Sequence, residues 1–152
     1  MLSKYDDFYF RAPEDLNSSG LLPRGILVIG SCLIGGFPEF FKARDPNIFS
    51  DYILFNNIAD IPAPPRPVQD YDFQIIQIPL RTVLPDNAIM RANFTDHAAM
   101  ADLLDQSKNR LRLCLEAGMR LNRESGILSF VTNFFVPQQN PLGRQGNRFS
   151  SV

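Results

Sequence analysis

The chain is predicted to fold as an α/β domain on a parallel sheet, and two features of its sequence support this. Short apolar segments alternate along the chain with segments in which apolar residues recur at helical spacing. Such alternation favours parallel strands that are covered by the intervening helices. The first apolar segment, residues 25–29, is rich in β-branched side chains and holds no polar residue, as expected of a strand buried on both faces.

The expected elements follow from local composition, taken in chain order. Four strands are expected where apolar residues run together: 25–29, 52–55, 73–78 and 127–132. They should be mutually parallel, with the first strand central, because crossover-length segments separate them. Helices are expected over 38–43, with Pro38 in the first turn, and over about 96–124, capped by Thr95 or Asp96 and ended by Gly126.

The remaining segments are predicted to be connections. Residues 1–24 are polar, aromatic and turn-rich, which indicates an N-terminal arm with little regular structure. The proline-rich residues 61–67 predict a stiff, extended connector. Residues 80–93 are expected to form a long loop, and loops of that length in a compact domain are usually functional. The domain itself is assigned to residues 25–143, followed by a flexible tail over 144–152.

Composition excludes several classes of protein. Fifteen basic and sixteen acidic residues give a net charge of -1, so no basic surplus indicates a nucleic-acid or anionic-membrane partner. The longest apolar stretch, residues 25–36, is too short and too rich in glycine to cross a bilayer. The two cysteines, Cys32 and Cys114, do not look like a disulfide framework and are interpreted as reduced thiols. A cytoplasmic location is therefore expected.

Polar residues at the ends of the expected strands nominate a ligand site. In open parallel sheets, ligands bind beyond the carboxyl ends of the strands, where the strand order reverses. Four side chains, Ser31, Cys32, Arg81 and Asn133, should therefore line one concavity. The second strand adds two neighbouring asparagines to this edge, Asn56 and Asn57.

The segment 30–36 does not fit the two common phosphate-binding patterns. It has no lysine, which the P-loop requires, and Cys32 stands where the dinucleotide fingerprint has its second glycine. Asn56 replaces the acidic residue expected after the next strand. Nucleotide binding is therefore disfavoured, and no cofactor or metal is expected.

A nucleophile at the first strand-to-helix turn is the sharper hypothesis. Either Ser31 or Cys32 would serve, with backbone N–H groups near Leu33 to Gly36 stabilising an oxyanion. The plainer alternative is that Ser31 caps the next helix and Cys32 fills a small apolar gap. The residues alone leave these two interpretations equally weighted.

The other candidates also have two interpretations each. Arg81 would bind a carboxylate or phosphate through its planar guanidinium, or it forms a surface pair with Asp86. The asparagines at strand ends would donate to an oxyanion, or they satisfy local turns. His97, the single histidine, is interpreted as a surface residue in the first turn of the long helix.

The first strand and its turn resemble the first block of the SGNH/GDSL hydrolase superfamily. In Ile26-Leu27-Val28-Ile29-Gly30-Ser31-Cys32, Ser31 matches the aspartate of the Gly-Asp-Ser block and Cys32 matches the nucleophilic serine. Residues 72–81 are similar to the third block, although Pro79-Leu80-Arg81 replaces its oxyanion asparagine, and Asn133 ends the fourth strand as in that fold. The family's Asp-x-x-His block is absent.

The resemblance implies a flavodoxin-like three-layer sandwich, and whether it is complete at its C-terminal side stays open. It implies an esterase or acyltransferase that acts on a small-molecule ester or an acylated carbohydrate. Two alternatives remain: a non-catalytic descendant that binds a small molecule or a protein, and an inactive N-terminal fragment of a larger enzyme. Because residues 138–152 contain neither histidine nor acid, we also expect a partly uncovered sheet that pairs with another copy or a missing segment.

Overall fold

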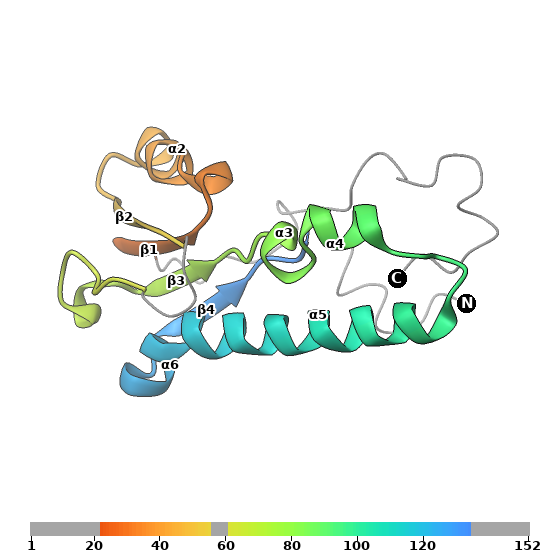
Figure 1. The fold of residues 1–152 in the computed structure, drawn as a ribbon. Coiled ribbons are helices and arrows are strands. Elements are labelled where there is room, and N and C mark those ends of the chain that lie inside the picture. Colours follow the sequence, from red (N-terminus) through yellow and green to blue (C-terminus); the bar gives the residue numbers. More distant parts are fainter. Residues whose placement is uncertain (1–21, 56–60, 135–152) are drawn as a thin grey trace, which may run out of the picture.

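A computed structural model of the chain describes residues 22–55 and 61–134, and it shows an α/β fold (Figure 1). Four parallel strands form one sheet in the order β2-β1-β3-β4. The strands are β1 (Gly25–Gly30), β2 (Phe49–Leu54), β3 (Phe73–Ile76) and β4 (Leu128–Val131). The prediction of parallel strands with the first one inside the sheet is confirmed.

Helices and short 3-10 turns connect the strands. The 3-10 turns are η2 (Cys32–Ile34) and η3 (Val68–Asp70). The helices are α2 (Phe37–Arg44), α3 (Leu80–Val83), α4 (Asp86–Arg91), α5 (His97–Gly118) and α6 (Arg120–Ser125). In the part of the chain that the structure describes, none of these helices combines the length and the apolar character that crossing a bilayer requires.

Strand β1 lies at the centre of two hydrophobic cores, and every one of its residues is buried. Successive side chains of a strand point to opposite faces. Ile26 and Val28 therefore pack on the α2 side of the sheet, whereas Leu27 and Ile29 join the core under α5 and α6. The apolar run that predicted a strand buried on both faces is explained by this position.

The helices lie on opposite faces because the two crossovers leave the middle of the sheet in opposite directions. The chain moves outward from β1 to β2 through α2, and it moves the other way from β3 to β4 through α5. Since parallel crossovers are right-handed, opposite directions place their helices on opposite faces. Aromatic side chains of α2 cover one face, and Cys114 of α5 and Leu121 of α6 cover the other.

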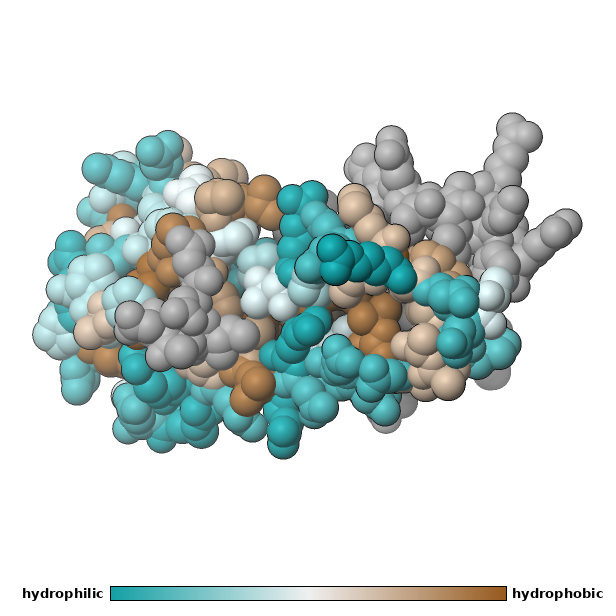
Figure 2. Space-filling model, viewed as in Figure 1, coloured by the Kyte–Doolittle hydropathy of each residue, from teal (hydrophilic) through white to brown (hydrophobic). Residues whose placement is uncertain are grey.

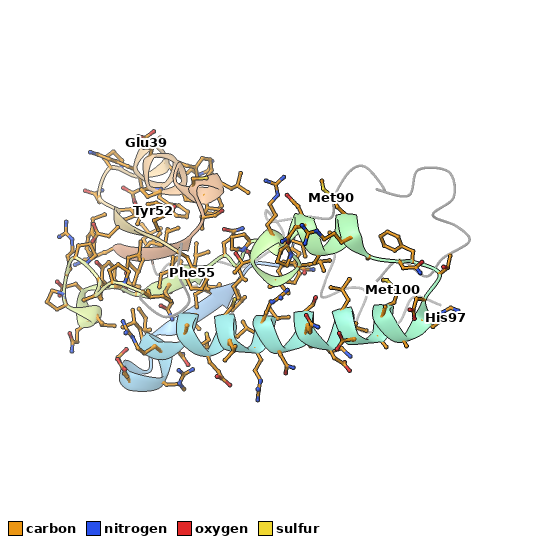
Figure 3. All side chains as sticks on the ribbon, in the orientation of Figure 1. Glu39, Tyr52, Phe55, Met90, His97 and Met100 are labelled. Carbon is orange, nitrogen blue, oxygen red and sulfur yellow. The ribbon has the colours of Figure 1, made fainter. Side chains whose placement is uncertain are left out.

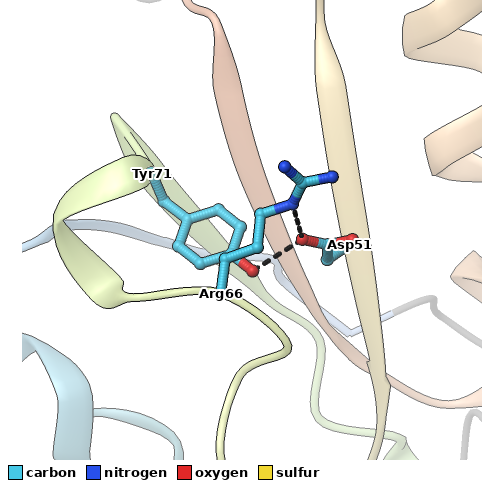
Figure 4. A network of polar contacts seen from close by, with 3 residues as sticks. All are labelled: Asp51, Arg66 and Tyr71. Atoms are coloured by element: carbon cyan, nitrogen blue, oxygen red, sulfur yellow. Dashed lines mark hydrogen bonds and ion pairs between the residues drawn. The ribbon is translucent and has the colours of Figure 1, made fainter.

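The β2–β3 connection is fastened to the sheet by a polar cluster (Figure 4). The Asp51 carboxylate accepts hydrogen bonds from Arg66 Nε at 3.0 Å and from the Tyr71 hydroxyl at 2.7 Å. The Arg66 guanidinium also lies 4.4 Å from the centre of the Phe49 ring. Burial and the Asp51 carboxylate raise the pKa of Tyr71, so its hydroxyl stays a proton donor.

Two expectations for the second half of the chain are wrong. Residues 80–93 are not one loop, because they contain α3 and α4. Pro79 and Pro85 each stand immediately before one of these helices, where a proline favours helix initiation although it also resembles a loop signal. The expected helix over 96–124 is divided at Met119 into α5 and α6, with Asp96 as the cap and Gly126 ending α6 at φ 75°.

Strand boundaries differ by up to three residues from those expected. β2 begins at Phe49 rather than at residue 52, because Ser50 and Asp51 continue the pairing with β1 despite their polarity. β3 ends at Ile76 rather than at residue 78. Most of the expected N-terminal arm, the asparagines Asn56 and Asn57 and the C-terminal tail lie outside the described residues.

One half of the sheet is covered less completely than the other. On the α2 side, Leu128 and Phe130 of β4 are 57% and 51% exposed, and Phe73 of β3 packs edge-on against Phe130. Hydrophobic side chains are also visible between α4 and the N-terminal half of α5 (Figure 2), where Met90 is 84% exposed. The fold therefore has a dense centre at β1 and an open flank at β4.

Candidate functional site

The site begins where β1 ends and the chain turns sharply into η2. A side chain at Gly30 would place its Cβ 2.5 Å from Ile34 Cδ1 and 2.9 Å from Gln77 Cβ. Contacts this short exclude any larger residue without rearrangement. Gly30 thus lets η2 approach the end of β3 closely.

Gln77 anchors this turn, and sequence reasoning missed it. Its side chain is buried, and Oε1 accepts hydrogen bonds from the Ser31 N–H at 2.9 Å and from the Ser31 hydroxyl at 2.8 Å. The available signal was an amide side chain inside an otherwise apolar strand segment. Gln77 joins the ends of β1 and β3, which flank the point where the strand order reverses.

The structure gives Ser31 a capping role. Its hydroxyl donates to Gln77 and accepts from the Leu33 N–H at 3.3 Å, so Ser31 is the N-cap of η2. Of the two interpretations of this residue, the capping one is seen directly. Ser31 would therefore have to break both bonds before its hydroxyl attacked a substrate.

Cys32, unlike Ser31, has an exposed side chain. It is the first residue of η2, and its side chain is exposed, so it does not fill an apolar gap. Nearby, the Tyr52 hydroxyl donates to the Gly30 carbonyl at 3.1 Å. Burial, and after it the charge of Cys32, raises the pKa of Tyr52, which therefore remains a neutral donor. The turn thus presents one accessible thiol on a fixed backbone.

The backbone amides expected to hold an oxyanion are mostly occupied. The Leu33 N–H donates to Ser31 Oγ, and the Gly35 N–H donates to the Cys32 carbonyl at 3.2 Å. Ile34 donates to the Ser31 carbonyl at 3.1 Å. Among the described residues, no acceptor is found for the N–H of Cys32 itself. The same holds, within those residues, for the N–H of Gly36.

Among the described residues, neither Arg81 nor Asn133 shares a hydrogen bond or a hollow with Cys32. Arg81 is the second residue of α3; its side chain is 83% exposed and its Nε lies 3.3 Å from Asp86, as in the surface-pair interpretation. Asn133 accepts a hydrogen bond from the Phe134 N–H and lines a hollow against α5 that includes neither Arg81 nor Cys32. Asn56 and Asn57 lie outside the described residues.

In residues 22–55 and 61–134, no hydrogen bond joins the Cys32 thiol to a histidine or a carboxylate that would act as a general base. His97 is the first residue of α5 and lies at the far end of that helix from Tyr52 (Figure 3). The same two ranges contain no group of three histidine, cysteine, aspartate or glutamate side chains arranged for a metal ion. Within the described residues, the turn therefore presents an exposed thiol that has no hydrogen-bonded histidine or carboxylate partner.

Comparisons of the chain with protein-family models, with curated proteins and with solved structures found no match. The α/β fold with four parallel strands is established by the structure. The chemistry of the site has to be inferred from the turn at Gly30, Ser31 and Cys32 and from its anchor, Gln77.

Proposed function

We propose that this chain is an SGNH-like acyl-transfer domain in which Cys32 is the nucleophile and an acyl or sugar ester is the substrate. The observation that carries the proposal is an exposed thiol on a turn that Ser31 and Gln77 hold at the carboxyl end of β1. That position borders the reversal of strand order, where open α/β sheets bind ligands. Ser31 positions the turn and does not attack the substrate.

The proposed reaction has two balanced steps. The Cys32 thiol loses its proton to solvent and the thiolate attacks the ester carbonyl. The carbon–oxygen bond then breaks, the leaving alkoxide takes a proton from solvent, and the acyl group remains on sulfur. Water or a sugar hydroxyl then attacks this thioester, takes the acyl group and returns the proton to the thiol. In this proposal the Cys32 N–H, for which no acceptor is found among the described residues, donates to the oxyanion in both steps.

One observation favours a second candidate, a descendant that binds the same ligands without turning them over. Among the described residues, neither a histidine nor a carboxylate is hydrogen-bonded to the Cys32 thiol. An activated ester transfers its acyl group to a thiolate without a base, whereas repeated turnover of an ordinary ester needs proton transfer. The two candidates therefore agree on ligand class and differ in turnover.

Acyl capture is the first test. The full chain is incubated with p-nitrophenyl acetate, and the modified residue is located by peptide mass mapping. We expect one acetyl group on Cys32, at a rate above that of a free thiol such as glutathione, and no labelling of Cys32→Ala. Cys114→Ala is the matched control, because Cys114 is fully buried and its removal should leave labelling unchanged. Labelling of Cys32 no faster than of glutathione would contradict the proposal.

Turnover separates the two candidates. Release of p-nitrophenol beyond one equivalent, lost in Cys32→Ala, supports the acyl-transfer domain. A single stoichiometric burst that then stops supports the binding descendant. Ser31→Ala should slow the burst without abolishing it, because it loosens the turn and keeps the thiol. If Ser31→Ala abolished the burst and Cys32→Ala left it unchanged, Ser31 would be the nucleophile and Cys32 would not.

A further inference from the structure

Within residues 22–55 and 61–134, one edge of strand β4 has no neighbouring strand. Among the described residues the strand pairs with β3 alone, at the end of the strand order. Leu128 and Phe130 are exposed on one face of the strand and Val131, 44% exposed, on the other. Exposed edges are normally blunted by charges, prolines or bulges. Residues 128–131 contain no charge and no proline, so this edge is suited to accept another strand.

A groove lies on the flank of α5 and reaches the end of β4 at Val131. Two hollows of about 370 and about 300 Å³ adjoin there, and Leu111 and Leu115 of α5 line both. Met119 extends the apolar floor at one end and Val131 at the other. We call this surface, with floor residues Leu111, Leu115, Met119 and Val131, the β4 groove.

The outer rim of the β4 groove is basic. Lys108, Arg112 and Arg123 border it, against a single acidic residue, Glu116. Arg112 and Arg123 form no ion pair within the described residues. Lys108 is 3.3 Å from Asp105, but both side chains are largely exposed and such pairs are weak. The rim therefore complements a segment that carries acidic side chains.

We infer that the β4 groove binds an extended segment of another protein, apolar on alternate residues and flanked by acidic ones, which adds to the sheet as a further strand. The Thr132 N–H donates to the Ile76 carbonyl of β3. Because peptide groups alternate in direction along a strand, the N–H of Val131 points to the open edge. Added strands gain affinity from such backbone bonds and specificity from side-chain pockets.

Charge selects this occupant over two others. A second copy would bring the same three cations to the groove, so self-pairing sets like charges together. Residues 135–152 of the chain carry Arg144 and Arg148 and no acid, so they do not complement the rim either. An acidic segment from another protein has neither disadvantage.

Selection from a displayed peptide library on the immobilised full-length chain tests this inference. We expect enriched peptides that alternate apolar residues and carry Asp or Glu at a flank. Val131→Pro removes the outward N–H without cutting a bond to β3, and it should abolish their binding. The double variant Arg112→Glu with Arg123→Glu changes exposed side chains only and should weaken binding by roughly tenfold or more. Cys32→Ala is the control that should bind normally, since this surface does not depend on the proposed acyl-transfer site.

Each other outcome overturns the inference. Failure to enrich any peptide over the Val131→Pro background would show that the edge takes no strand, once circular dichroism confirms that the variant is folded. Enrichment of peptides that carry no acidic residue would show that the basic rim does not recognise the ligand. A dimer in sedimentation that Val131→Pro abolishes would identify a second copy as the occupant. Stronger peptide binding by Asp6→Lys with Asp7→Lys would identify the chain's own acidic N-terminal segment instead.

Discussion

Strands β1 and β4 have similar apolar sequences but opposite environments. Leu27 and Val28 of β1 are fully buried, whereas Leu128 of β4 is 57% exposed and Phe130 is 51% exposed. β1 has a strand on each side, α2 on one face and α5 on the other. β4 lacks a second neighbouring strand in the described structure. An apolar run thus indicates a strand, and its neighbours decide how much of that strand is buried.

The strongest test of this comparison is Leu27→Ala. Leu27 lies in the larger core with Ile76 and Cys114, and a cavity there cannot be filled by solvent or by an open surface. We expect the free energy of unfolding to fall by about 3 kcal/mol, measured by urea denaturation. A loss below about 1 kcal/mol would mean that the centre of the sheet is loosely packed.

Gln77→Met tests how much the hydrogen bonds at the carboxyl end of β1 contribute to stability. The substitution keeps the volume of the side chain but leaves the Ser31 N–H and hydroxyl without their acceptor. We expect a loss of about 2 kcal/mol in the free energy of unfolding. In a Ser31→Ala background the loss should be smaller, because one donor is already gone. Equal losses in both backgrounds would show that Gln77 acts by packing alone.

Phe130→Ala is the matched change on β4. Its ring is half-exposed and contacts Phe73 edge-on, at 5.4 Å between ring centres. We expect the free energy of unfolding to fall by about 1 kcal/mol, well below the effect of Leu27→Ala. Denaturation of the two variants side by side checks this. A loss as large as that of Leu27→Ala would erase the distinction between the two strands.

Asp72 gives the smallest expected effect and a dependence on pH. Its carboxylate accepts hydrogen bonds from the Gly25 and Arg24 N–H groups, which lower its pKa in the folded chain. The resulting stability is present above the unfolded pKa and is lost as pH falls through the folded value. Because Asp72 is exposed, we expect less than about 1 kcal/mol.

Asp72→Asn checks that expectation. Below the folded pKa the variant and the parent should be about equally stable, and the parent should gain over the variant as pH rises to neutrality. Thermal unfolding between acidic and neutral pH measures the difference. A constant difference across the whole range would show that Asp72 acts without its charge.

Local sequence determined the parallel strands, the position of β1 inside the sheet and the caps of the long helix. These features depend on the residues' own periodicity and chemistry: the apolar run at 25–29, Asp96 before α5 and Gly126 after α6. The loop predicted over residues 80–93 was wrong because Pro79 and Pro85 precede helices. A proline before a helix and a proline in a loop cannot be distinguished from the neighbouring residues alone.

Tertiary structure alone decided which residues the ends and edges of those elements contact. Ser31 and Gln77 are 46 residues apart, and their bond follows from the pairing of β1 with β3. The exposure of Cys32 depends in the same way on how η2 lies across the sheet. The open edge of β4 follows from the strand order. Periodicity reports which face of an element is apolar, whereas contacts between distant elements are set by the path of the chain between them.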